Sequence, residues 1–164
     1  MGSPTEVQPN REEALARNIL EEMIPFNRLV GVKVLKVEHG RVELGVENRP
    51  DLMGNFFLGA VHGGVIMTMM DVAAGAAVVS SMESFRHMKD LTTVDMRADF
   101  LRMGRGERFV CRAEVLRRGK SLATCRMEFL DMENQLLATG MAVFRILTNG
   151  DQKPQSNTLT EEQP

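Results

Sequence analysis

The sequence is poor in the residues that mark several specialised classes of protein. It has no Trp, no Tyr, two Cys and three scattered His among 164 residues. Cys111 and Cys125 form neither a CxxC pair nor a disulfide framework, so we expect a reducing, cytoplasmic location. The three His have no nearby Cys or Asp cluster, which argues against a metal site.

Neither sign of charge dominates the chain. Its net charge is −2 and its isoelectric point is near 6.0, which argues against a dedicated nucleic-acid binder. The N-terminus has no apolar signal core, so nothing suggests export. Residues 1–10 and 148–164 are polar, and we expect both to be disordered on either side of a single domain over 11–147.

One long apolar run stands out over residues 60–80, and Asp71 is its only charged residue. The run is long enough to cross a bilayer, but a carboxylate at its middle would be costly there. The sequence therefore favours a buried helix from about Gly63 to Ser81 and no membrane partner.

The remaining elements are mostly strands. Residues 11–24 have helical spacing and stop before Pro25. Alternation predicts a hairpin of 30–38 and 41–47, with a bulge where the phase slips between Val34 and Leu35. A loop follows over 48–62, and a polar connection over 82–91. Four further strands are expected at 93–100, 108–116, 121–130 and 135–147.

This order predicts an α+β fold in which one very apolar helix is wrapped by an antiparallel sheet. The strand over 93–100 puts Met96, Ala98 and Phe100 on one face and Asp95, Arg97 and Asp99 on the other. The expected inward residues of the next two strands are Phe109, Cys111, Ala113, Val115, Ala123, Cys125, Met127 and Phe129. One small sheet covers only one side of the helix, so we expect a second subunit to cover the rest.

Asp71 lies on a helical stripe of small and polar residues, Gly64, Thr68, Asp71 and Gly75. Two interpretations follow. The stripe packs tightly, with Asp71 hydrogen-bonded to a neighbouring strand, or it faces a ligand cleft in which Asp71 is the reactive carboxylate.

The triplet His62, Gly63 and Gly64 precedes this stripe. Unpaired N–H groups at a helix start favour negative charge or a polarised carbonyl. Gly63 and Asp71 are eight residues apart, about 12 Å along a helix, which is too far for one reacting centre. Two antiparallel helices from two chains remove this obstacle. The spacing therefore predicts a homodimer with shared sites, built from Gly63 and His62 of one subunit and Asp71 of its partner.

The run from Asn55 to Asp71 resembles the hotdog-fold thioesterases of the PaaI-like family. The segments PFNRLVG (25–31), GNFFLGAVHGGVI (54–66), DVAAG (71–75) and DFLRMGRGERF (99–109) resemble its YigI-type branch. The resemblance implies a hotdog fold, with a long central helix wrapped by an antiparallel sheet and an N-terminal helix. It also implies dimers that usually pair into a dimer of dimers, a homotetramer.

The same resemblance implies hydrolysis of acyl-CoA thioesters, medium- to long-chain in the nearest relatives, with no cofactor because CoA is part of the substrate. Asp71 would be the general base or nucleophile, and the Gly63 amide would polarise the carbonyl. His62 would orient that loop, and Thr93 would help to position water. Asn55 lies seven residues before His62, one more than the usual spacing, so its role stays open.

Two basic loops, over 101–108 and 117–121, are candidates for binding the CoA phosphates and pantetheine. The expected substrate-binding residues are Gly64, Thr68, Arg102, Arg105, Arg117, Arg118, Gly119, Lys120 and Ser121. The candidates for an apolar acyl slot are Met67, Met69, Met70, Phe56, Phe57 and Leu58.

Two other functions stay open on the sequence alone. A hotdog hydratase or dehydratase would act on an acyl-CoA double bond, and a non-catalytic module would only bind acyl-CoA. Release of free thiol from acyl-CoA separates the hydrolase from both.

Overall fold

The computed structural model describes residues 11–82 and 84–147, so the expectations for 1–10 and 148–164 lie outside the described residues. The main sheet is antiparallel and six-stranded, in the order β1-β2-β6-β7-β8-β5. Its strands are β1 (Lys33–Glu38), β2 (Arg41–Glu47), β5 (Leu91–Phe100), β6 (Arg108–Arg118), β7 (Leu122–Leu130) and β8 (Leu136–Ile146). The predicted α+β arrangement is confirmed.

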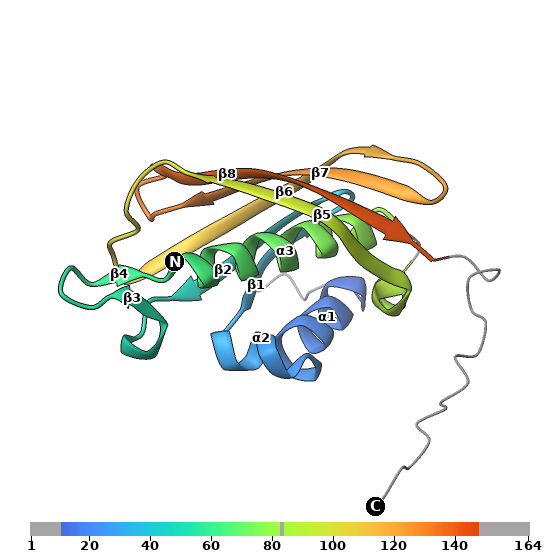
Figure 1. Ribbon diagram of the computed structural model, residues 1–164. Coiled ribbons are helices and arrows are strands. Elements are labelled where there is room, and N and C mark those ends of the chain that lie inside the picture. Colours follow the sequence, from blue (N-terminus) through green and yellow to red (C-terminus); the bar gives the residue numbers. More distant parts are fainter. Residues whose placement is uncertain (1–10, 83, 148–164) are drawn as a thin grey trace, which may run out of the picture.

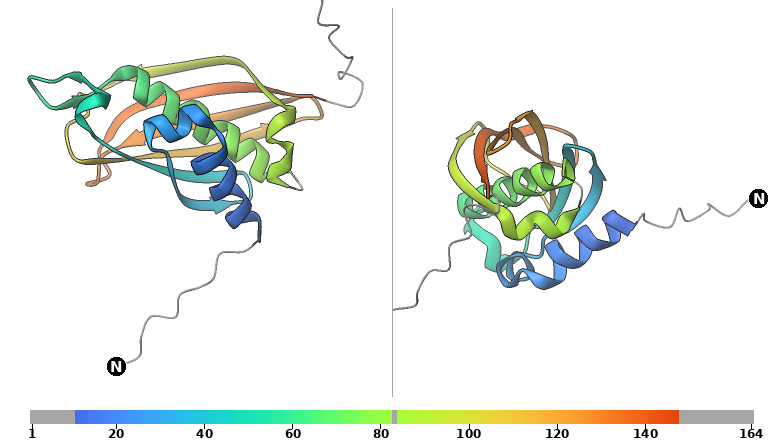
Figure 2. Two further views of the ribbon diagram at one scale, coloured as in Figure 1. Left: turned by 90° about the horizontal axis from the view of Figure 1, so that it is seen from below. Right: turned by 90° about the vertical axis from the view of Figure 1, so that its right-hand side faces the viewer.

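The long helix α3 (Gly63–Ser80) packs against the concave face of this sheet, which curves around it in the end-on view of Figure 2. The helix is apolar apart from the stripe that carries Thr68 and Asp71, and it is long enough to cross a membrane by length and composition. Eleven of its 18 residues are buried inside the fold, as in a core helix. A helix this apolar must be covered on nearly all sides, and this requirement shapes the rest of the molecule.

The N-terminal segment covers the side of α3 that faces away from the sheet (Figure 1). It consists of α1 (Arg11–Arg17), a π-helical turn η1 (Asn18–Met23) and α2 (Pro25–Val30). Helix α2 was not predicted, although its signals are present. Pro25 stands at its first turn, and Gly31 ends it in the left-handed conformation at φ 83°. Part of the cover that we expected from a second subunit therefore comes from the same chain.

Both predicted connections contain short ordered elements. The loop over 48–62 holds the 3₁₀ turn η2 (Pro50–Leu52) and a small hairpin of β3 (Met53–Asn55) and β4 (Ala60–Val61) that projects from the domain (Figures 1 and 2). The connection over 82–91 holds the 3₁₀ helix η3 (Phe85–Asp90). A carboxylate oxygen of Glu12 accepts a hydrogen bond from the Phe85 N–H, which ties η3 to α1.

The strand patterns agree with the structure except on β5. The pairing of β1 with β2 shifts between Val34 and Lys36, which confirms the predicted bulge. The inward residues of β6 and β7 are buried, apart from the half-buried Val115. On β5, Met96 and Ala98 are half-buried, whereas Phe100 is 54% exposed, although its ring lies beside Gly63 at the start of α3. β5 is an edge strand with no neighbour on its outer side.

Candidate active site

Asp71 lies at the middle of α3 and is half-buried. Its Oδ1 accepts a hydrogen bond of 2.9 Å from the Thr93 hydroxyl on β5. A hydrogen bond from a hydroxyl to a carboxylate fixes one oxygen and leaves the other free to contact a ligand. The structure thus brings together the two residues that the sequence proposed for the base and for the water-positioning hydroxyl.

A cavity of about 340 Å³ opens beside this carboxylate. Thr68, Asp71 and Gly75 of the predicted stripe line it, together with Thr93. Its size lies in the range of small-molecule sites. Both interpretations of Asp71 are thus partly met, since the carboxylate bonds to a neighbouring strand and also faces a cavity. We call Asp71, Thr93 and this cavity the Asp71 half-site.

The other predicted site residues, His62 and Gly63, lie at the start of α3. His62 is the N-cap residue, and its Nδ1 accepts a hydrogen bond of 2.9 Å from the Gly64 N–H. The neutral ring consequently carries its proton on Nε2. This bond occupies the Gly64 amide, whereas the Gly63 amide has no hydrogen-bond partner among the described residues. The turn presents one free donor at the positive end of the helix dipole.

Gly63 faces a second cavity, of about 380 Å³, which is separate from the first. Ile66, Phe100 and Arg102 line it as well, and we call Gly63 with this cavity the Gly63 half-site. Eight residues of α3, about 12 Å, separate Gly63 from Asp71. Within one chain the two half-sites do not face the same space.

The two basic loops lie at opposite ends of α3, which is about 27 Å long. Arg102 and Arg105 are exposed near the Gly63 end, where Arg102 donates to the Leu136 carbonyl. At the other end Arg118 donates a hydrogen bond of 3.0 Å to the Ser81 carbonyl, just past the end of α3. Arg118, Gly119 and Lys120 border a wide hollow of about 1130 Å³ there. Arg117 and Ser121 are exposed beside them.

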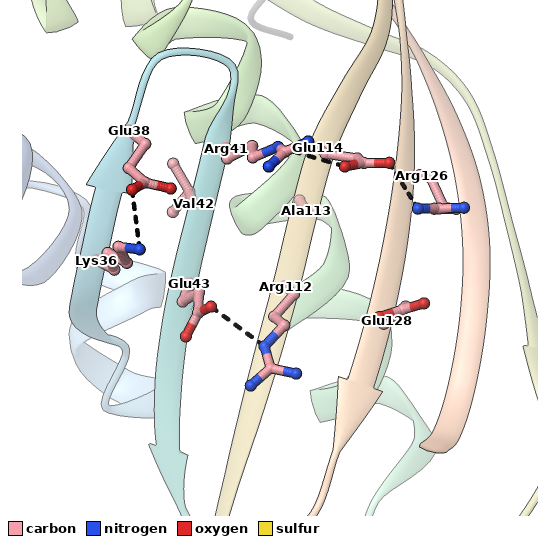
Figure 3. A pocket seen from close by; sticks show the side chains of 10 residues that line it. All are labelled: Lys36, Glu38, Arg41, Val42, Glu43, Arg112, Ala113, Glu114, Arg126 and Glu128. Carbon is pink, nitrogen blue, oxygen red and sulfur yellow. Dashed lines mark hydrogen bonds and ion pairs between the residues drawn. The ribbon is translucent and has the colours of Figure 1, made fainter. Parts of the chain in front are cut away.

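A fourth hollow lies on the outer face of the sheet (Figure 3). Its charged residues are four acids and four bases, Glu38, Glu43, Glu114, Glu128, Lys36, Arg41, Arg112 and Arg126. Most of them form cross-strand pairs, such as Arg126 with Glu114 at 2.6 Å and Arg112 with Glu43 at 3.2 Å. Because the charges are matched, this face has no excess of either sign with which to select an ionic substrate.

The six residues expected for the acyl slot lie apart from the Asp71 cavity. Met69 and Met70 are fully buried in the core, and Phe56 and Phe57 lie exposed at the tip of the β3–β4 hairpin. The apolar lining of that cavity includes Leu20, Ile24 and Phe26 of the N-terminal segment, which sequence reasoning missed. The signals of α2 at Pro25 and Gly31 could have revealed the helix, but not its position over Asp71.

Asn55 lies on β3, exposed and away from both cavities. Its carbonyl accepts a hydrogen bond from the Leu58 N–H within the hairpin. Across 11–82 and 84–147, no group of three or more His, Cys, Asp or Glu side chains is arranged to hold a metal ion.

Comparison with known proteins places these features in a family. Residues 58–138 match the model of the thioesterase superfamily. The chain is 34% identical over 133 residues to the medium/long-chain acyl-CoA thioesterase YigI of Escherichia coli (strain K12), covering 75% of this chain and 86% of YigI. It is 32% identical over the same length to YigI of Salmonella typhimurium, with the same coverage.

Solved structures agree in fold. A protein from Shewanella oneidensis related to the thioesterase superfamily superposes with a TM-score of 0.74 at 28% identity, covering 81% of this chain and 94% of that chain. The PaaI protein of Escherichia coli gives a TM-score of 0.71 at 16% identity over 82% and 93% of the two chains, a likeness of fold alone. With its long helix inside an antiparallel sheet, this chain has the hotdog fold and belongs to the thioesterase superfamily.

Proposed function

We propose that the protein hydrolyses medium- to long-chain acyl-CoA thioesters to the free acid and CoA. The observation that carries the proposal is the Asp71 carboxylate, held by Thr93 at the mouth of a largely apolar cavity. The similarity to YigI supports acyl-CoA as the substrate class. Within this proposal 11–147 is one hotdog domain, and no cofactor takes part.

The chemistry follows from the groups at the two half-sites. As a general base, Asp71 takes a proton from water while the water oxygen bonds to the carbonyl carbon. As a nucleophile, it attacks that carbon itself and forms an anhydride, which water then hydrolyses. In both routes the C–S bond breaks with its electron pair going to sulfur, and the thiolate leaves without needing a strong acid. The Gly63 N–H donates to the carbonyl oxygen as negative charge develops there.

A dimer with antiparallel α3 helices brings the half-sites of two chains together. The start of one helix then lies beside the middle of the other, so Gly63 of one protomer approaches Asp71 of its partner. Large apolar side chains lie exposed near the Gly63 end, and Phe57 is 84% exposed. Phe100 and Met103 are half-exposed around the Gly63 cavity. Such surface is typical of an interface, and supports the homodimer.

The same dimer puts the two basic loops on one side of each shared site. Arg102 and Arg105 lie beside Gly63, and the partner's α3 carries its Arg118 and Lys120 beyond its Asp71. We propose that these loops bind the phosphates and pantetheine of CoA, with Arg117, Gly119 and Ser121 in the second loop. We include Gly64 and Thr68, which follow Gly63 on α3, and the Thr68 hydroxyl donates to the Gly64 carbonyl at 2.9 Å.

The charged outer face of the sheet limits where the two dimers of the proposed dimer of dimers can make contact. Its ion pairs are formed within one sheet, so stacking two such faces would remove matched charges from water. We therefore place the contact of a homotetramer away from this face. The free state of both cysteines supports a cytoplasmic enzyme.

A thiol-release assay tests the proposal. Straight-chain acyl-CoAs are offered to the purified protein, and free thiol is followed with a chromogenic reagent. Asp71→Asn, which keeps the side chain's shape, should abolish turnover and leave the oligomer and Tm unchanged. Asp51→Asn, an exposed carboxylate outside both cavities, is the control and should retain activity. Normal turnover by Asp71→Asn, or hydration of an enoyl-CoA without thiol release, would contradict the proposal.

A further inference from the structure

The Asp71 cavity is polar at one end and apolar at the other. Thr68 lies one helical turn before Asp71, and Gly75 lies one turn after it. Thr93 is beside the carboxylate, whereas Leu91, two residues earlier on the same strand, lies beside Gly75. The cavity therefore runs along α3 from the reacting groups towards Gly75.

The residues that line the Asp71 cavity favour the hydrocarbon chain of the substrate over its CoA part. Asp71 is the only charged residue among the twelve that border it, and no Lys or Arg is present. Phosphates of CoA would meet a carboxylate there with no cation to balance them. An alkyl chain would instead contact apolar side chains such as Ile24, Phe26, Val72 and Phe144.

Gly75 determines how close a chain can come to the cavity's inner end. A Cβ added there would lie 3.5 Å from the Phe144 ring and 3.6 Å from Leu91 Cδ2, both ordinary van der Waals distances. The missing side chain thus leaves room that a methyl group would fill without displacing its neighbours. Met88 lies at the same end, because its carbonyl accepts from the Leu91 N–H.

We infer that this cavity is the acyl-chain site and that Gly75 and Met88 set the longest chain it accepts. The inference rests on the proposed thioesterase activity and adds the residues of its specificity. The cavity volume of about 340 Å³ lies in the range of sites that bind small molecules, so it has room for an alkyl chain.

Two substitutions with opposite expected effects test it. Gly75→Ala should lower kcat/KM about tenfold for the longest chain that the wild type hydrolyses well, since one methyl in an apolar pocket discriminates to that extent. The kcat/KM for shorter chains should fall less, so the preference shifts towards them. Met88→Ala removes a wall at the same end and should shift the preference towards longer chains.

Met82→Ala is the matched control, because Met82 is also half-buried against the core but lies outside the cavity. It should leave the chain-length profile unchanged. Tm and oligomeric state are measured for all three variants, and Gly75→Ala should keep or raise Tm because alanine favours a helix more than glycine does.

The outcomes separate this inference from the proposed function. Opposite shifts in preference support the inference. If the wild type hydrolyses acyl-CoAs and both variants keep its profile, the cavity is not the acyl site, although the activity stands. If no acyl-CoA of any length releases thiol, the proposed function and the inference both fail.

Discussion

The Thr93 hydroxyl donates a 2.9 Å hydrogen bond to Oδ1 of Asp71, joining the edge strand β5 to the middle of the core helix. The bond links segments 22 residues apart and holds the carboxylate at the cavity mouth. A hydrogen bond to a charged group contributes about 1.5–3 kcal/mol, so its loss is measurable.

Thr93→Val should lower kcat by roughly 10- to 100-fold, because the carboxylate loses the donor that holds it in position for the reaction. Valine keeps the shape of threonine and removes only the donor. Thr93→Ser keeps the donor and should retain most of the activity. Steady-state kinetics of the two variants decides the matter, and equal losses in both would assign the effect to packing.

Gly63→Pro tests the free amide directly. Proline is favoured in the first turn of a helix and has no N–H, and the residue before it, His62, already has the extended backbone that precedes proline (φ −68°, ψ 137°). Loss of one such donor should lower kcat by about 10²–10³ without unfolding the protein. Gly63→Ala keeps the N–H and is the control. An active Gly63→Pro enzyme would exclude the amide from catalysis.

Mixed oligomers test whether the sites are shared. Chains carrying Gly63→Pro are co-expressed with chains carrying Asp71→Asn, each inactive alone. With random pairing, half of the dimers are mixed and each has one intact site, so activity should return to about a quarter of the wild-type value. If each site lay within one chain, mixing would restore nothing.

Substitutions at Arg118 and Lys120 distinguish a role in capping α3 from a role in binding the substrate. Arg118 donates to the Ser81 carbonyl at the negative end of the α3 dipole, so Arg118→Ala should lower the free energy of unfolding by about 1 kcal/mol. Lys120 is exposed, and Lys120→Ala should leave Tm unchanged. Both should raise KM for acyl-CoA, less so at high salt. Unchanged KM in both would remove this loop from the CoA site.

The two cysteines should not react in the folded protein. Both are buried, and burial raises the pKa of Cys125 to about 12 and that of Cys111 still further. Only thiolates attack disulfide reagents, so at pH 8 the native protein should release no chromophore, and the unfolded protein should show two thiols. Prompt labelling of the native protein would contradict this burial.

Their ionisation also makes stability depend on pH. The folded pKa of Cys125 lies above the unfolded value near 9, so the neutral thiol is favoured in the native state. The stability this contributes is fully present below about pH 9 and declines as the pH rises towards 12. Chemical unfolding of Cys125→Ala, compared with the wild type across that range, measures the difference.

The sequence was informative where local chemistry decides the outcome. A single acid in an apolar run made Asp71 a candidate, and a glycine pair at a helix start made Gly63 a candidate. The Asp71 cavity was beyond such reasoning because its walls come from η1, α2, α3, η3, β5 and β8, which only the fold brings together. Phe26 is as apolar as any core residue, and no local sequence pattern indicates that it lines the Asp71 cavity. The exposure of Phe100 likewise depends on β5 being an edge strand.

The N-terminal segment supplies one wall of the cavity but none of the proposed reacting groups, Asp71, Thr93 and the Gly63 amide, which lie on α3 and β5. Substitutions at Ile24 or Phe26 can therefore reshape substrate preference while the chemistry stays intact. Exchange of the N-terminal segment, in evolution or by engineering, would then give a family of enzymes that share one reaction and differ in which fatty acid they release.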